Sequence, residues 1–265
     1  MIKYNKNNPL RVFEALAGYS SQSLALRRLR DVYLEFDFVR VGWSEFDPFS
    51  NLPIEKQPAV VANMALFPED ADKNYGDICK VPWAEVSDFD LFTYSFPCTD
   101  ISAAGKQRGL SRDSGTRSSL LWECEKAIEI KRPTYLLMEN VAQLISQKFI
   151  KDFHEWLRIL EHYGYESFTQ VLDSSKYGVP QHRERVFCVS ILRTEDNPNP
   201  KYNFPKPFKL ERCLADVLEE DVDESYFLSD EMLSRFCTKS LEEEEGGGIK
   251  EPVESDDFED FFVGG

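Results

Sequence analysis

The feature that most constrains the fold is an alternation of short apolar runs with amphipathic segments. Apolar runs that predict strands occupy residues 10–16, 38–45, 90–96, 134–140, 166–173 and 185–192. Segments with helical spacing lie at residues 20–30, 118–130 and 149–164. Strands that alternate with helices imply a mostly parallel sheet with helices on both faces, so we predict an α/β fold.

The chain changes character near residue 210, after the proline-rich segment 197–208. Residues 211–265 carry 19 acidic and 4 basic side chains, whereas residues 1–210 carry 28 and 27, so the C-terminal part holds nearly all of the net charge of −16. We predict a main domain over 1–210, a short helical appendage over 211–240 and an acidic, disordered tail over 241–265. The nearly neutral main domain is compatible with a polyanionic partner.

Cysteine usage and hydropathy indicate the compartment. The six cysteines form no C-x-x-C pair and do not cluster with the three histidines, which favours a reduced protein without a metal site. The first ten residues contain no apolar stretch, and no run approaches the roughly 18 apolar residues of a membrane span. We therefore expect a cytoplasmic protein with no signal peptide and no membrane partner.

Residues able to do chemistry follow the predicted strands. Cys98 comes directly after Pro97, where the third apolar run gives way to polar residues. A cysteine seen alone in this position is more often a core filler than a nucleophile. Glu139 stands at the end of the fourth predicted strand. Arg183 and Arg185 alternate into the last strand, so both should point to the same side and face an anion or a carbonyl group.

A turn of small residues follows the first predicted strand. Leu16, Ala17, Gly18 and Ser20 lie between this strand and the first predicted helix. Such a turn lets the backbone approach a ligand closely, although an ordinary strand-to-helix connection has the same composition.

Carboxylates near the second predicted strand could complete a nucleoside site. Glu45 closes this strand about 27 residues after Gly18, where a carboxylate can accept hydrogen bonds from both ribose hydroxyls. Phe46 offers a face for an adenine ring. Asp77 and Ile78 could hold the adenine edge, although a plain turn explains them equally well.

Four motifs in fixed order resemble those of a known family. "ALAG" (15–18), "FPC" (96–98), "MENV" (138–141) and "QHRER" (181–185) look like core motifs of the DNA cytosine-5 methyltransferases, over about residues 10–192. The resemblance implies a Rossmann-like methyltransferase sheet in the main domain, with S-adenosylmethionine at the strand ends. It also implies DNA as the partner and a place in restriction-modification.

The resemblance assigns roles to the strand-end residues. Cys98 matches the nucleophile that attacks carbon 6 of cytosine, and Glu139 matches the proton donor to ring nitrogen 3. Arg185 looks like the clamp on the base carbonyl oxygen, with Arg183 beside it. Residues 99–115 resemble a mobile loop that closes over the DNA backbone. The implied cofactor-binding residues are Leu16, Ala17, Gly18, Ser20, Glu45, Phe46, Asp77, Ile78 and Pro97.

The chain also departs from the family pattern. Thr99, Ser20 and Leu16 replace the glutamine, the second glycine and the aromatic residue that are common there. We find neither a target-recognition region nor the family's closing asparagine stretch after residue 192. Three interpretations remain open: one subunit of a split enzyme whose partner recognises the target, a truncated remnant, or a non-catalytic subunit that binds DNA or cofactor. A methyltransferase acting on RNA cytosine is a further alternative.

Overall fold

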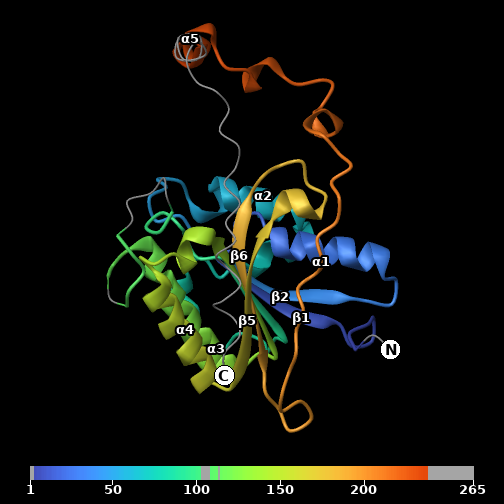
Figure 1. The fold of residues 1–265 in the computed structure, drawn as a ribbon, viewed down its shortest axis with the longest axis vertical. Coiled ribbons are helices and arrows are strands. Elements are labelled where there is room, and N and C mark those ends of the chain that lie inside the picture. The colour runs from blue at the N-terminus through green and yellow to red at the C-terminus, as the bar shows by residue number, and fades with distance from the viewer. Residues whose placement is uncertain (1–2, 103–107, 113, 238–265) are drawn as a thin grey trace. The chain divides into compact units, whose positions relative to one another are not determined.

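The computed structural model describes residues 3–102, 108–112 and 114–237 (Figure 1). The chain forms two compact units, one ending at Leu214 and one beginning at Ala215. Within the second unit, the described part includes the helix α5 (Asp230–Cys237), while the predicted tail over 241–265 lies outside the described residues. In the described parts of the chain, no helix is both long enough and apolar enough to cross a membrane.

The first unit is an α/β domain. Its strands and α-helices are, in chain order, β1 (Leu10–Ala15), α1 (Ser21–Val32), β2 (Phe38–Ser44), α2 (Pro58–Leu66), β3 (Leu91–Tyr94), α3 (Leu121–Lys131), β4 (Tyr135–Val141), α4 (Ile150–His162), β5 (Tyr165–Asp173) and β6 (Glu184–Leu192).

The sheet is mixed, with strand order β2-β1-β3-β4-β6-β5. The four strands from β2 to β4 in this order run parallel, as the alternation of strands and helices predicts. The sheet is mostly parallel, as predicted, and β6 is the exception, since it runs antiparallel to both β4 and β5. The reason is the connection over residues 174–183, which is too short to hold the crossover helix of a parallel pair.

Helices cover both faces of the sheet, as predicted. Phe13 and Tyr94 belong to the main core together with Trp156 of α4, whose Nε1 donates a hydrogen bond to the Tyr94 hydroxyl at 3.1 Å. Val12 is on the opposite face of β1, in a smaller cluster against which Leu26 of α1 packs. Figure 1 accordingly shows α3 and α4 on one side of the sheet and α1 on the other.

The strand order places a topological switch point beside β1. From β1 the chain moves to β2 on one side, and it later returns to place β3 on the other side of β1. In open α/β sheets, ligands bind where the connections diverge in this way, at the carboxyl ends of the strands. The turn after β1 and the loop after β3 therefore flank the expected ligand site.

Candidate active site

The turn between β1 and α1 has an unusual backbone. Leu16, Gly18 and Ser20 have φ angles of 54°, 55° and 63°, in the left-handed region that side chains disfavour. The Ala17 amide donates to the carbonyl of Ser44 at 3.0 Å, which joins the turn to the end of β2. A Cβ atom added at Gly18 would meet no atom within 4 Å, so the turn borders open space that a ligand could fill.

Glu45 lies immediately after β2, as predicted, and faces this turn. The Gly18 amide donates a hydrogen bond to Glu45 Oε2 at 2.7 Å. Burial raises the pKa of the Glu45 carboxyl, and this amide opposes the shift. Asn74 Oδ1 accepts from the amides of Glu45 (3.1 Å) and Gly76 (2.9 Å), so Asn74 joins the end of β2 to the segment before Asp77.

The remaining predicted cofactor residues have varied environments. Asp77 accepts a hydrogen bond from the backbone of the short 3-10 helix that follows it, whereas Ile78 is 3% exposed and belongs to the main core. Phe46 is partly buried beside Glu45. The Pro97 carbonyl accepts a hydrogen bond from the Ser118 hydroxyl at 2.6 Å, which fixes the backbone just before Cys98.

Cys98 lies in a loop beyond β3. The strand ends at Tyr94, so the predicted strand was too long at this end. The carbonyl of Cys98 accepts hydrogen bonds from the amides of Ile101 (3.0 Å) and Ser102 (2.8 Å), which turn the chain sharply after the cysteine. The side chain is partly buried and packs against the main core.

Asn140 connects the Cys98 loop to the strand that carries Glu139. The residue is 3% exposed, and its Nδ2 donates a hydrogen bond to the carbonyl of Phe96 at 2.9 Å. Its Oδ1 accepts from the amide of Val141 at 2.8 Å. The bond to Phe96 joins β4 to the segment between β3 and Cys98, whereas the bond to Val141 is local to β4. Asn140 therefore links the strand that carries Glu139 to the segment that leads into Cys98.

Glu139 and Arg185 form an ion pair. Arg185 Nε lies 3.1 Å from Glu139 Oε1, and the two side chains are 21% and 22% exposed. In the antiparallel ladder Glu139 is opposite Phe187, so Arg185, two residues away, lies on the same face of the sheet. Glu139 was expected at the strand end but lies within β4, since the ladder to β6 continues through Val141.

Arg183 is not part of the last strand, contrary to the prediction. The ladder begins at Asp173 and Glu184, which leaves Arg183 exposed in the preceding turn. Asp173 accepts hydrogen bonds from His182 Nδ1 (2.7 Å) and the Arg183 amide (3.2 Å). Desolvation would raise the pKa of Asp173, but these bonds and those from Ser175 outweigh it and lower the pKa to about 2.

Asp100, near the start of the predicted mobile loop over residues 99–115, is hydrogen-bonded to a residue within this loop and to another just beyond its other end. Asp100 is 1% exposed, and its carboxylate accepts hydrogen bonds from Arg108 Nε at 2.8 Å and from the Arg117 amide at 2.9 Å. Burial would raise the pKa of Asp100, but Arg108 and these backbone groups outweigh it and lower the pKa. The remaining loop residues lie outside the described part of the chain.

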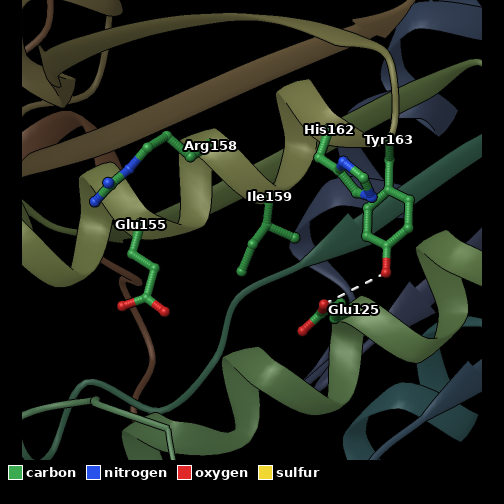
Figure 2. Close-up of a pocket in the computed structure, with 6 residues that line it drawn as sticks. All are labelled: Glu125, Glu155, Arg158, Ile159, His162 and Tyr163. Carbon is green, nitrogen blue, oxygen red and sulfur yellow. Dashed lines mark hydrogen bonds between the residues drawn. The ribbon is translucent and has the colours of Figure 1, made fainter.

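A separate pocket of about 450 Å³ lies between α3 and α4 (Figure 2). Figure 2 shows the Tyr163 hydroxyl directed at Glu125, to which it donates at 3.4 Å. The pocket contains none of the predicted site residues and is lined by Glu125, Glu155, Arg158, Ile159, His162 and Tyr163. In the described residues, no group of three or more His, Cys, Asp or Glu side chains could hold a metal ion.

Comparisons with known proteins agree with this geometry. The family model for C-5 cytosine-specific DNA methylases matches residues 55–260. Type II methyltransferase M2.ScrFI of Lactococcus lactis subsp. cremoris is 39% identical over an alignment of 262 positions, which covers 85% of this chain and 72% of that protein. Orphan methyltransferase M.SssI of Spiroplasma monobiae is 32% identical over an alignment of 272 positions, which covers 85% of this chain and 69% of that protein.

The solved structures support the same fold. A mutant of Spodoptera frugiperda DNMT2 superposes with a TM-score of 0.63 at 19% sequence identity. The superposition covers 86% of this chain and 65% of that chain. At this identity the likeness establishes the Rossmann-like methyltransferase fold and nothing finer.

The Asn140 bridge generates a prediction. Asn140→Ala removes the donor to the buried Phe96 carbonyl, so the free energy of unfolding should fall by about 1–3 kcal/mol. Denaturant unfolding monitored by tryptophan fluorescence measures this difference. Asn197→Ala, at an exposed asparagine, is the matched control and should change stability by less than about 0.5 kcal/mol. Equal stability of the two variants would show that the bridge contributes nothing.

Proposed function

Because the chain belongs to the C-5 cytosine-specific DNA methylase family, and is therefore a DNA methyltransferase that uses S-adenosylmethionine, we propose that Cys98, Glu139 and Arg185 act together on one cytosine. The observation that carries this proposal is the Glu139–Arg185 ion pair at 3.1 Å. Asn140, the neighbour of Glu139, is in turn bonded to the segment that leads into Cys98.

The proposed reaction begins at the thiolate of Cys98. Carbon 5 of cytosine is too weak a nucleophile to accept a methyl group directly. The thiolate forms a bond to carbon 6, and the displaced electron pair makes carbon 5 enamine-like. As Arg185 turns from Glu139 to the base, Glu139 takes up a proton from solvent and passes it to ring nitrogen 3. Carbon 5 would take the methyl group from the sulfonium sulfur of the cofactor, whose electron pair stays on that sulfur. Carbon 5 then loses its proton to solvent, ring nitrogen 3 returns its proton to Glu139, and the bond from carbon 6 to sulfur breaks to restore the thiolate.

Arg185 has two roles in this proposal. Its ion pair with Glu139 holds both side chains at the site before a base enters. With a base present, Arg185 donates to the carbonyl oxygen of the ring and stabilises the charge that develops there. The target cytosine must leave the duplex to reach these groups.

The turn after β1 and the end of β2 would hold the cofactor, which supplies an electrophilic methyl group when bound. The open space beside Gly18 and the carboxylate of Glu45, which faces it, fit a nucleoside with free ribose hydroxyls. We assign the remaining contacts to Leu16, Ala17, Phe46, Asp77, Ile78 and Pro97. Ser20, which the sequence also suggested, is fully buried and is assigned no direct contact with the cofactor.

DNA and protein partners are assigned to two further surfaces. The exposed Arg183 and the loop over residues 99–115 would contact the DNA backbone near the flipped base. We also propose a second protein subunit for target recognition. Its support is the second unit, where Tyr226 and Phe227 are 81% and 67% exposed among mainly acidic residues. That partner would present an apolar and basic surface, and the complex would act on DNA in the cytoplasm.

The nucleophile assignment predicts a trapped adduct. DNA that contains 5-fluorocytosine should remain covalently attached to Cys98, because fluorine cannot leave carbon 5 as a proton does. The full chain, cofactor and this DNA are incubated and resolved on a denaturing gel. The incubation is done with and without the product of the adjacent gene, which is the candidate for the proposed second subunit. The band should be absent from Cys98→Ser, and its persistence in that variant would reject the assignment.

The proton-donor assignment predicts a loss of rate. Glu139→Gln keeps the shape of the side chain but has no acidic proton, so methyl transfer should slow by at least roughly 100-fold. Single-turnover transfer of labelled methyl groups measures the rate. Glu166 lies on β5 and forms a partly exposed ion pair with Arg193. Glu166→Gln is the control and should keep nearly full activity. Comparable rates for the two variants would contradict the role of Glu139.

The subunit assignment predicts low activity of the chain alone. Methyl transfer to mixed-sequence DNA should rise when the neighbouring gene product is added, and the double substitution Tyr226→Ser and Phe227→Ser should remove this rise. Val32→Ser, at a residue of α1 that is 72% exposed, is the control and should keep it. Strong sequence-specific methylation by the unassisted chain would overturn the subunit proposal without affecting the catalytic one.

A further inference from the structure

Ser20 is the last residue of the turn that borders the proposed cofactor site, and its backbone is strained. It is fully buried, has a φ of 63°, and immediately precedes α1. It is the N-cap residue of this helix, but its side chain makes no capping hydrogen bond. Its hydroxyl instead accepts from Asn63 Nδ2 at 2.6 Å and from Arg40 Nη2 at 3.0 Å.

Asn63 joins two of the left-handed residues. It lies on α2 and is fully buried. Besides Ser20, its Nδ2 reaches the carbonyl of Gly18 at 3.3 Å, and its Oδ1 accepts from Arg40 Nη2 at 3.2 Å. One side chain from a distant helix therefore contacts both Gly18 and Ser20.

Arg40 anchors this set in the interior. Its residue is 1% exposed, its guanidinium lies 4.4 Å from the centre of the Phe67 ring, and Asp70 Oδ2 is 3.9 Å from Nη1. Burial lowers the pKa of Arg40, while the nearby carboxylates of Glu14 and Asp70 oppose this shift. Among the residues that the structure describes, Arg40 Nε and Nη1 are buried without a hydrogen-bond partner, and only Nη2 is bonded, to Ser20 and Asn63. A buried guanidinium is costly unless it is paired and hydrogen-bonded, so loss of these two contacts would leave all three nitrogens unsatisfied.

We propose that Ser20, Asn63 and Arg40 are positioning residues that hold the turn after β1 in the conformation that binds the cofactor. A serine, unlike glycine, does not adopt the left-handed region readily, so side-chain hydrogen bonds must keep it there. While they do, the backbone at Gly18 stays open to a ligand and its amide stays directed at Glu45. This inference rests on the proposed cofactor site.

The test compares two substitutions that both remove the hydroxyl. Ser20→Ala keeps a side chain that disfavours the left-handed region, whereas Ser20→Gly does not. Binding of S-adenosylhomocysteine to the full chain, measured by calorimetry, should weaken about tenfold in Ser20→Ala, which corresponds to about 1.4 kcal/mol. It should change by less than about threefold in Ser20→Gly. Equal weakening in both variants would overturn the proposal, because the hydroxyl would then act in some way other than holding the backbone.

Asn63→Ala extends the test to the partner side chain. It should weaken binding about as much as Ser20→Ala in the wild-type background and distinctly less in the Ser20→Gly background, because a glycine no longer needs the hydrogen bond. Equal effects in the two backgrounds would reject the coupling. Thermal unfolding of each variant identifies a loss of binding that follows only from general destabilisation, which would also count against the proposal.

A measurement without cofactor separates this inference from the function on which it rests. Amide hydrogen exchange of the segment 15–24 should be faster in Ser20→Ala than in Ser20→Gly. If the wild type fails to bind S-adenosylhomocysteine but this order of exchange is found, the cofactor assignment is wrong and the positioning of the turn is supported. If the wild type binds and the exchange rates are the same, the positioning role is overturned.

Discussion

The parallel pairing of β1 with β2 on one side and β3 on the other is the constraint on which the site depends. It brings the carboxyl ends of these strands to one edge of the sheet, with the connections diverging on either side of β1. The turn that ends at Ser20 and the loop that contains Cys98 come from segments about 80 residues apart in the chain, yet they follow the carboxyl ends of neighbouring parallel strands. Hydrophobic packing on both faces fixes the register of these strands, because a slip by one residue would exchange the Val12 and Phe13 faces.

Single asparagine side chains, buried or partly buried, hydrogen-bond these loops and strand ends to one another. Asn140 joins the segment before Cys98 to β4, Asn74 joins Glu45 to the segment before Asp77, and Asn63 joins Gly18 to Ser20. Each amide side chain offers both a donor and an acceptor, so one residue can satisfy backbone groups of two segments at once. Because these groups have few alternative partners in the interior, the loops are held more firmly than their irregular backbone suggests.

Local sequence pattern predicts those features of the fold that depend on neighbours in the chain. The strand positions, the two helical layers and the position of Glu45 directly after β2 follow from hydrophobic periodicity. The antiparallel direction of β6 and the place of Arg183 outside it depend on which strand pairs with which, and periodicity does not contain that information. Asn74, Asn63 and Arg40 were not identified from the sequence, since a polar residue shows a role only when its partners in space are known.

The ion pair of Glu139 and Arg185 illustrates how the groups of the proposed site are oriented before a base enters. Each side chain is about one-fifth exposed, so the two charges are shielded from water only in part. At this exposure the pair contributes little to stability, and its main effect is to orient the groups. A base that enters would displace the remaining water, and the Arg185 guanidinium would then interact more strongly with it in a less polar surrounding. Glu139 and Arg185 are thus arranged in advance, at low cost, for the groups of a pyrimidine ring that a carboxyl and a guanidinium can recognise.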